Sequence, residues 1–201
     1  MAIARVAGQT PQAAGSAGAT SIAVTLPQNV VAGNAVMAVG KFRNSTPAFS
    51  DNLGNTYATD ITVDPISADN GIKIGSAKNL TTGGACTITF GTFTSSRCGI
   101  SAMEYSGFTG GAALDQSTSA TGSSASAASG ATATTTAADE LLIGGMSDGG
   151  GVTYTWTGSF TVVAGNTTGR FSMGDRVVAA TGAYNATATL SATNTWHAAI
   201  A

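Results

Sequence analysis

Charged residues are scarce in this 201-residue chain. Only 9% of its residues are Asp, Glu, Lys or Arg, whereas about 25% is typical of soluble domains. With 8 basic and 10 acidic residues, the formal net charge is -2. The chain therefore lacks the basic footprint that a nucleic-acid backbone or an anionic membrane attracts. We expect neither of these partners, and we expect a surface that is polar but mostly uncharged.

Groups suited to catalysis are equally few. A glycosidase needs two carboxylates that flank the scissile bond, and Glu104, Asp115 and Asp175 are conceivable members of such a pair. Each falls within or beside a strand-like stretch, where a lone carboxylate usually faces water or a structural partner. The one match to the G-x-S-x-G nucleophile motif, "GMSDG" from Gly145 to Gly149, is followed by no helical pattern that could complete a strand-to-helix nucleophile elbow. We therefore expect no enzyme activity, no cofactor and no catalytic residue.

The only histidine, His197, lies in the final segment "NTWHAAIA". A histidine general base in a catalytic triad also needs a nucleophile, an orienting carboxylate and an oxyanion hole. Alternation along the segment places Trp196, Ala198 and Ile200 on the opposite face. We interpret His197 as an ordinary residue on one face of a strand.

Long hydrophobic runs and helical periodicity are also absent. No segment is long and apolar enough for a signal-peptide core or a membrane span, so synthesis in the cytosol is expected. Alternation with period two dominates instead, as in "YNATATLSAT", "CTITF" and "RFSMGDRVV", and "AVMAVGKF" is apolar on both faces. This pattern predicts an all-β chain of about a dozen strands, folded as one two-sheet, jelly-roll-like β-sandwich domain over residues 1–201. We expect the strand near Ile3 to Ala7 to lie close to the strand near Trp196 to Ile200.

One tract, Ser117 to Ala138, consists of small and nearly all uncharged side chains. Its composition is compatible with a flexible linker. Alternating Ala and Thr still has the period of a strand, and we favour two narrow surface strands joined by a turn. A loop or edge of this kind would let the backbone of a neighbour approach closely.

The two cysteines, Cys86 and Cys98, are predicted to flank a hairpin whose turn lies near Gly91 to Ser96. That placement would allow a disulfide across adjacent strands. Two cysteines and one distant histidine are too few for a tetrahedral zinc site. Because cytosolic synthesis favours reduced cysteines, we expect two buried thiols.

The stretch "SDNLGNTYATD", Ser50 to Asp60, combines aspartates, asparagines and a glycine beside a tyrosine. It does not fit a calcium loop of the EF-hand type, because Leu53 occupies the third position and Gly54 comes two places early. Turn chemistry explains the composition, with Asp51 bonding to nearby backbone and Gly54 at positive φ. We expect no metal here, although a calcium cluster of Asp51, Asp60, Asp64 and Asp69 is the alternative.

A second glycine-rich stretch, "GGMSDGGG" from Gly144 to Gly151, lacks the Lys-Ser/Thr pair of a phosphate-binding loop. No helical pattern follows it to supply an N-terminal dipole. We interpret it as a turn between strands.

Several segments together resemble a recurring β-sandwich module of bacteriophage virion proteins and large bacterial surface proteins. They are "MEYSGF" (Met103 to Phe108), "ALDQSTSATG" (Ala113 to Gly122), "ADELLIGG" (Ala138 to Gly145), "SDNLGNTYATD" and the final "GDRVVAATGAYNATATLSATNTWHAAIA". The resemblance covers nearly the whole chain. It implies a jelly-roll-like fold with structural or adhesive roles and no catalytic residues.

Two functions are compatible with these features. The first is a structural virion protein, such as a capsid decoration protein or a head-fibre or tail component, whose partners are other virion proteins and copies of itself. The second is a carbohydrate-binding or adhesin module that binds a host-surface glycan through Tyr57, Tyr154 or Trp156. In alternating strands such aromatics are more often core residues. We therefore favour the virion protein.

Overall fold

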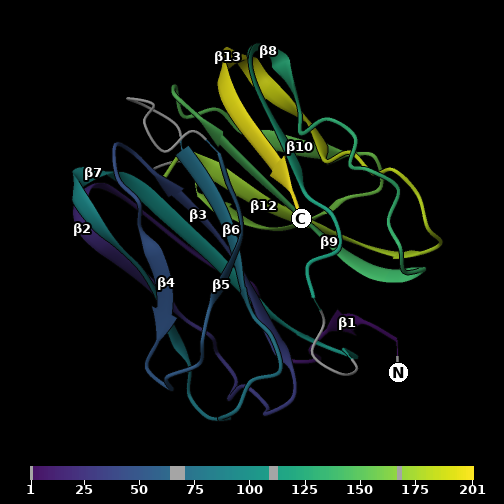
Figure 1. Cartoon of the computed structure of the whole chain (residues 1–201). Coiled ribbons are helices and arrows are strands. Elements are labelled where there is room, and N and C mark those ends of the chain that lie inside the picture. Colours follow the sequence, from purple (N-terminus) through teal and green to yellow (C-terminus); the bar gives the residue numbers. More distant parts are fainter. Residues whose placement is uncertain (1, 64–70, 109–112, 167–168) are drawn as a thin grey trace.

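The computed structural model describes residues 2–63, 71–108, 113–166 and 169–201. Its regular elements are all β-strands, and they form two sheets (Figure 1). The strands are β1 (Ala4–Arg5), β2 (Gln12–Thr25), β3 (Ala35–Phe42), β4 (Ala48–Asp51), β5 (Ala58–Val63), β6 (Gly71–Ala77), β7 (Thr87–Ser106), β8 (Thr118–Ala128), β9 (Asp139–Asp148), β10 (Tyr154–Thr157), β11 (Thr161–Asn166), β12 (Phe171–Ala179) and β13 (Thr187–Ile200). The predicted all-β, two-sheet sandwich is confirmed. Nowhere in these ranges is there a helix with the length and hydropathy that crossing a membrane requires.

Each sheet is built from one continuous run of strands. The first sheet has the order β1-β7-β3-β6-β5, and β2 and β4 also pair with β7. The second has the order β10-β13-β9-β12-β11, and β8 also pairs with β13. In Figure 1 the purple-to-teal strands accordingly gather on one side and most green-to-yellow strands on the other. Since the chain completes one sheet before starting the next, the jelly-roll-like part of the prediction is not confirmed.

The two sheets share one connectivity. In the first, β7 has β2 along one side and β4 followed by β3 along the other, and β3 leads through β6 to β5. In the second, β13 has β8 along one side and β10 followed by β9 along the other, and β9 leads through β12 to β11. The strands β2 to β7, here called the first unit, and β8 to β13, the second unit, therefore repeat a single topology.

Local details repeat as well. The β5–β6 pairing shifts register between Ile74 and Gly75, and the β11–β12 pairing shifts register between Met173 and Gly174. Each glycine is covered by an aromatic ring from the corresponding short strand, β4 or β10. A Cβ atom on Gly75 would lie 2.7 Å from the ring of Phe49, and one on Gly174 would lie 2.6 Å from the ring of Trp156. Both glycines are needed because a side chain would collide with these rings.

The hydrophobic core has three parts. One cluster lies within the first unit, a second lies within the second unit, and the third lies between the two sheets. Strand β3 shows how one strand serves two clusters, because Val36 belongs to the cluster of the first unit and Met37 to the cluster between the sheets. All eight residues of β3 are buried. This confirms that "AVMAVGKF" forms a strand buried on both faces.

The two terminal strands belong to different sheets. Strand β1 pairs with the end of β7, whereas β13 pairs with β8, β9 and β10. Ile3 and Ile200 nevertheless line the same pocket. The chain ends approach each other across the sandwich without pairing.

The Ser117–Ala138 tract is neither a linker nor the predicted hairpin of two strands. Residues Thr118–Ala128 form the single strand β8, and the chain then continues in an extended conformation alongside residues 182–186. The hairpin prediction was wrong because the residues after β8 do not form a second strand. They bond to residues 182–186 partly through serine and threonine hydroxyls, which take the place of backbone carbonyls as acceptors. The tract is thus an integral part of the second unit.

This replacement follows a regular pattern. Three residues, spaced three apart, each make two hydrogen bonds to one partner residue. The backbone N–H donates to the partner's carbonyl at 2.9 Å in every case. The side-chain hydroxyl accepts from the partner's N–H at 3.0 to 3.2 Å. The pairs are Ser129 with Ala186, Thr132 with Tyr184, and Thr135 with Gly182. The spacing of three matches the repeat of a polyproline II segment. All three hydroxyl-bearing residues are buried. Their hydroxyls serve as acceptors that hold this segment to its neighbour.

Replacing Thr132 by valine tests this ladder. Valine keeps the shape of threonine but removes the hydroxyl that accepts from the Tyr184 N–H at 3.0 Å. We expect the free energy of unfolding to fall by about 1.5 kcal/mol, because a donor left without an acceptor costs about 1 to 3 kcal/mol. Thr134→Val is the matched control, since Thr134 is exposed. Urea denaturation of the two variants measures the difference, and equal midpoints would contradict the ladder's role.

Candidate functional site

Glu104, the first of the three candidate catalytic carboxylates, is fully buried at the end of β7. Its Oε1 accepts from the Val31 N–H at 2.8 Å and from Asn34 Nδ2 at 2.7 Å. Its Oε2 accepts from Gln9 Nε2 at 2.7 Å. Oε1 is therefore occupied by the segment that leads into β3, and Oε2 by the segment that leads into β2. A carboxylate held in this way braces the fold and has no open side for a substrate.

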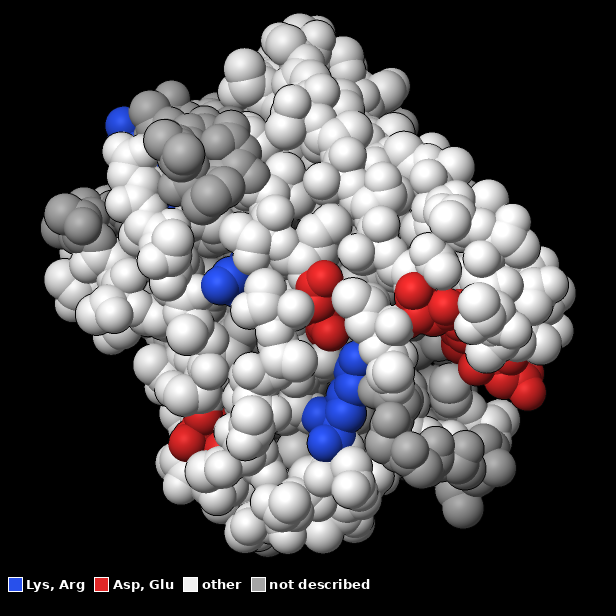
Figure 2. All heavy atoms as spheres, viewed as in Figure 1, with Lys and Arg blue, Asp and Glu red and all other residues white. Residues whose placement is uncertain are grey.

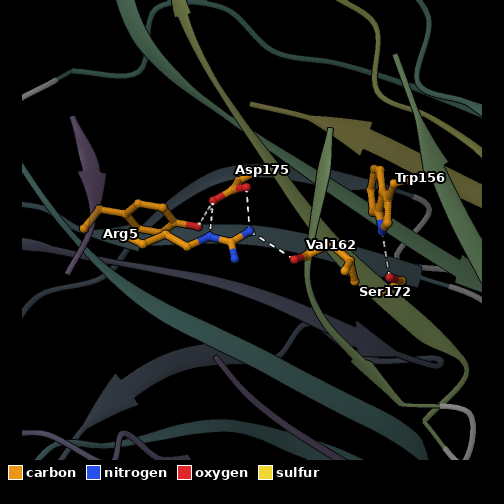
Figure 3. A network of polar contacts seen from close by, with 6 residues as sticks. Arg5, Trp156, Val162, Ser172 and Asp175 are labelled. Carbon is orange, nitrogen blue, oxygen red and sulfur yellow. Dashed lines mark hydrogen bonds and ion pairs between the residues drawn. The ribbon is translucent and has the colours of Figure 1, made fainter. Parts of the chain in front are cut away.

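Asp175 joins the two sheets (Figure 3). Its oxygens accept from Arg5 Nε at 2.8 Å and from Arg5 Nη2 at 2.7 Å, and Tyr105 donates its hydroxyl at 2.8 Å. Arg5 also donates to the carbonyl of Val162 at 3.0 Å. The hydrogen bond to Asp175 raises the pKa of Arg5, and burial, followed by the nearby Asp175, raises that of Tyr105. Asp175 is a structural ion-pair partner in this arrangement.

Asp115 lies elsewhere, beside the segment that follows β8. It accepts from the Thr136 N–H at 2.5 Å and from the Thr136 hydroxyl at 3.0 Å. The Thr136 N–H and a hydrogen bond with Glu140 lower the pKa of Asp115 to about 2. The three candidate carboxylates have separate partners, and no hydrogen bond joins any two of them. Each candidate carboxylate is thus held by groups of the fold other than a second candidate.

His197 occupies the predicted strand position. It lies in β13, is 7% exposed, and has Ser147 and Thr121 as its cross-strand neighbours. Trp196, Ala198 and Ile200 belong to the cluster of the second unit, as the alternation predicted. The cross-strand neighbours of His197 include no carboxylate that could orient it as a general base.

The cysteines are two separate buried thiols. Cys86 and Cys98 are both free, as expected. The predicted hairpin between them was wrong, because residues 87–106 form the one continuous strand β7. Strand β2 pairs along most of its length and holds it extended. Burial, followed by the nearby Asp51, raises the pKa of Cys86 to about 12, so this thiol is unreactive at neutral pH.

The Ser50–Asp60 stretch forms a turn organised by one carboxylate. Asp51 Oδ1 accepts from the N–H groups of Leu53 at 3.0 Å and Asn55 at 3.1 Å, and Oδ2 accepts from the Tyr57 hydroxyl at 3.3 Å. Gly54 has a φ of 76°, as predicted. The turn chemistry predicted from the sequence is confirmed. The composition of this stretch is therefore explained by bonds within the chain.

The same device recurs in the glycine-rich stretch. Asp148, at the end of β9, accepts from the N–H groups of Gly150, Gly151 and Val152, and Tyr154 donates its hydroxyl at 2.6 Å. The segments "DNLGNTY" and "DGGGVTY" share a D-x-x-G-x-T-Y pattern, with Gly54 and Gly151 both at positive φ. Comparing the two segments would have revealed this repeat from the sequence. The glycine N–H groups bind the chain's own aspartate where a phosphate loop would bind its ligand.

The alternative calcium cluster has two members that can be placed. Asp51 is used in its turn, and Asp60 forms an ion pair with Lys78 at 3.4 Å. Asp64 and Asp69 lie outside the described residues. Within the described ranges, no three His, Cys, Asp or Glu side chains are grouped as a metal site would require.

The candidate glycan-binding aromatics are packed into the fold. Tyr57 lies against the cluster of the first unit, and Tyr154 and Trp156 lie against the cluster of the second unit. Trp156 stacks on Phe160 and donates its ring N–H to Ser172 at 2.9 Å (Figure 3). These roles agree with the expectation that the three rings are core residues.

Two long edge strands are the most distinctive surface feature. Strands β2 and β8 occupy equivalent places in the two units, and each has a strand partner on one side only within the described part of the chain. Neither contains a charged residue or a proline, although soluble proteins usually block such edges with charge, proline or bulges. The β2 pairing is interrupted by two register shifts, whereas β8 pairs evenly from Thr118 to Ser124. The edge of β8 is therefore the better candidate for binding another strand.

Comparison of the chain with protein-family models, with curated proteins and with solved structures finds no match.

Proposed function

We propose that the chain is a structural protein of a bacteriophage particle that acts by being bound and has no turnover. In this role it is a capsid decoration protein or a component of a head fibre or tail. Its partners are other virion proteins, such as the major capsid protein or tail and fibre proteins, together with copies of itself. It is made in the host cytoplasm and acts in the virion.

The observation that carries this proposal is the uncharged edge of β8. The eleven residues Thr118–Ala128 contain only Ala, Gly, Ser and Thr, and their outer side has no strand partner in the described part of the chain. Unpaired N–H and C=O groups along such an edge bind another extended strand by β-augmentation. Small side chains let the partner backbone approach closely. An edge left open in this way suits a protein that is held in an assembly.

The internal use of polar groups gives further support. The carboxylates of Asp51, Glu104, Asp148 and Asp175 are all bonded within the chain. Figure 2 shows a face on which charged side chains are few and most of the surface is uncharged. A chain of this kind offers little catalytic chemistry. The similarity of its segments to virion modules agrees with a structural role.

Weak contacts are sufficient in such a role. A particle presents many identical sites at fixed spacing, so the chains of one oligomer add their affinities through effective concentration. Each edge contact then needs only modest strength. The absence of a large charged surface is compatible with this mode of binding, which depends on backbone hydrogen bonds.

Lysine substitutions on the edge strand test the proposal. Ser119 and Ser123 are exposed on β8, so the double variant Ser119→Lys/Ser123→Lys should fold normally. Repulsion and desolvation of the added charges block strand pairing, and we expect incorporation into particles to fall at least tenfold. Thr189→Lys is the control, because Thr189 is exposed on β13, which has neighbours on both sides. Quantitative mass spectrometry of purified particles measures incorporation.

Two outcomes would contradict the proposal in different ways. If the double variant enters particles at the wild-type ratio, β8 is not the binding edge. If the wild-type chain is missing from particles, the virion role itself is wrong. Thermal melting of each variant separates a binding defect from a folding defect.

A further inference from the structure

A pocket lies between the two units. Its volume is about 380 Å³, which falls within the range of about 300 to 1,000 Å³ for small-molecule sites. Apolar side chains from both sheets line it, including Met37 and Ile74 from the first unit and Ile143 and Ile200 from the second. A bound group would therefore be surrounded by hydrocarbon on two sides. This feature plays no part in the edge contact proposed above.

Acidic side chains are concentrated at this pocket. Asp60, Asp115, Asp139 and Glu140 line it, which is four of the ten acidic residues in the chain. Lys78 is the one basic residue among its lining residues, and it forms an ion pair with Asp60 at 3.4 Å. Figure 2 shows acidic side chains at the right of this face, with others near its centre and at its lower left. The lining of the pocket therefore carries more acidic than basic side chains. The other carboxylates in the described part of the chain are bonded within the fold.

Two of these carboxyl groups are arranged as a pair. Asp115 is fixed by the N–H and hydroxyl of Thr136, at 2.5 and 3.0 Å, and shares a hydrogen bond with Glu140. Burial and this neighbour raise the pKa of Glu140. Oε2 of Glu140 is buried, and it accepts no hydrogen bond from the parts of the chain that the structure describes. This oxygen is an acceptor that still lacks a donor.

We propose that the pocket binds an alkylammonium group, with its hydrocarbon chain against the apolar lining and its ammonium at Asp115 and Glu140. An ammonium supplies the missing donors and offsets the negative charge, whereas an anion would meet Asp115, Asp139 and Glu140. A divalent cation such as Ca²⁺ takes six to eight oxygen ligands and gains nothing from an apolar lining. The shared chemistry fits either a free aliphatic amine or the side chain of a partner's lysine. The inference is independent of the virion role.

The charge of the ligand is the first test. Titration calorimetry on the full chain with n-hexylammonium, n-hexanol and hexanoate compares three ligands of nearly equal shape. We expect saturable binding of hexylammonium, at least tenfold weaker binding of hexanol and no binding of hexanoate. Binding of hexanol as tight as that of hexylammonium would overturn the proposal.

Variants expected to change the affinity for hexylammonium in opposite directions make the test sharper. Glu140→Gln and Asp115→Asn each remove a negative charge and should weaken hexylammonium binding at least tenfold. Lys78→Met removes the competing cation and should strengthen it several-fold. Thr134→Val, whose residue is exposed and not among the lining residues, should leave it unchanged. Wild-type affinity in both carboxyl variants would contradict the assignment, and thermal melting confirms that each variant is folded.

A lysine-containing peptide with blocked ends distinguishes the two sources of the ligand. Tighter binding of the peptide than of hexylammonium supports the side chain of a partner's lysine, and the reverse supports a free amine. Either result supports the proposal. Failure of both probes would overturn it while leaving the virion role intact.

Discussion

Replacing Glu104 by alanine is expected to lower the free energy of unfolding by about 4 kcal/mol. The carboxylate is fully buried and accepts from three donors, on Gln9, Val31 and Asn34. Each buried donor that loses its acceptor costs about 1 to 3 kcal/mol, and bonds to a charged group lie at the upper end. The segment leading into β3 would lose its main polar anchor. Urea denaturation monitored by far-ultraviolet circular dichroism measures the loss.

The control for this variant is Glu140→Ala, since Glu140 is the only other glutamate in the chain. Glu140 is partly exposed, and without it Asp115 keeps its two hydrogen bonds to Thr136. We expect its unfolding midpoint to stay close to that of the wild type. A loss below about 1 kcal/mol for Glu104→Ala would mean that the buried network is not stabilising.

Replacing Asp175 by alanine is expected to cost about 3 kcal/mol. Removing one member of a buried ion pair typically costs about 3 to 5 kcal/mol. The Arg5 side chain is 31% exposed, so solvent recovers part of its charge and the loss falls at the lower end. The Tyr105 hydroxyl, which is buried, would also lose its acceptor. The two sheets would then be joined mainly by the apolar cluster between them.

The variant Tyr105→Phe separates the parts of this network. It removes one hydrogen bond to Asp175 and leaves the ion pair with Arg5, so a loss of about 1 kcal/mol is expected. Because the residues share one network, the double variant Asp175→Ala/Tyr105→Phe should lose less than the sum of the single losses. Strict additivity would show that Tyr105 and Asp175 act independently.

Alternation in the sequence was sufficient to predict the fold class. Segments such as "RFSMGDRVV" and "AVMAVGKF" are strands β12 and β3, because one face or both faces meet a hydrophobic cluster. The hairpin between Cys86 and Cys98 was mispredicted because the symmetric cysteine spacing carried no turn residue besides Gly91. The threonines and phenylalanines around it favour a strand, and β2 supplies the partner that keeps β7 straight.

The shared connectivity of the two units could not be read from the sequence. Equivalent positions hold different residues, as with Phe49 and Trp156, which cover Gly75 and Gly174. What the units share is strand order and the position of a bulge, and many sequences satisfy these requirements.

The candidate sites were predictable only in part. The turn at Asp51 followed from local chemistry, because the donors on Leu53, Asn55 and Tyr57 lie within six residues of it along the chain. The pocket was not predictable, because Asp60 and Lys78 come from the first unit, and Asp115 and Glu140 meet them only when both sheets are in place. The Ser/Thr ladder after β8 was also missed, because Thr132 and Tyr184 are distant in the sequence.

The central claim is that this chain works by being bound in a virus particle. Its most direct test is quantitative mass spectrometry of particles purified from host cultures that produce the chain, combined with a density map of those particles. The account predicts a fixed number of copies per particle and a two-sheet density whose β8 edge contacts a neighbouring subunit. Absence of the chain from the particles would contradict it, and so would its appearance only in the lysate with an assayable hydrolase activity.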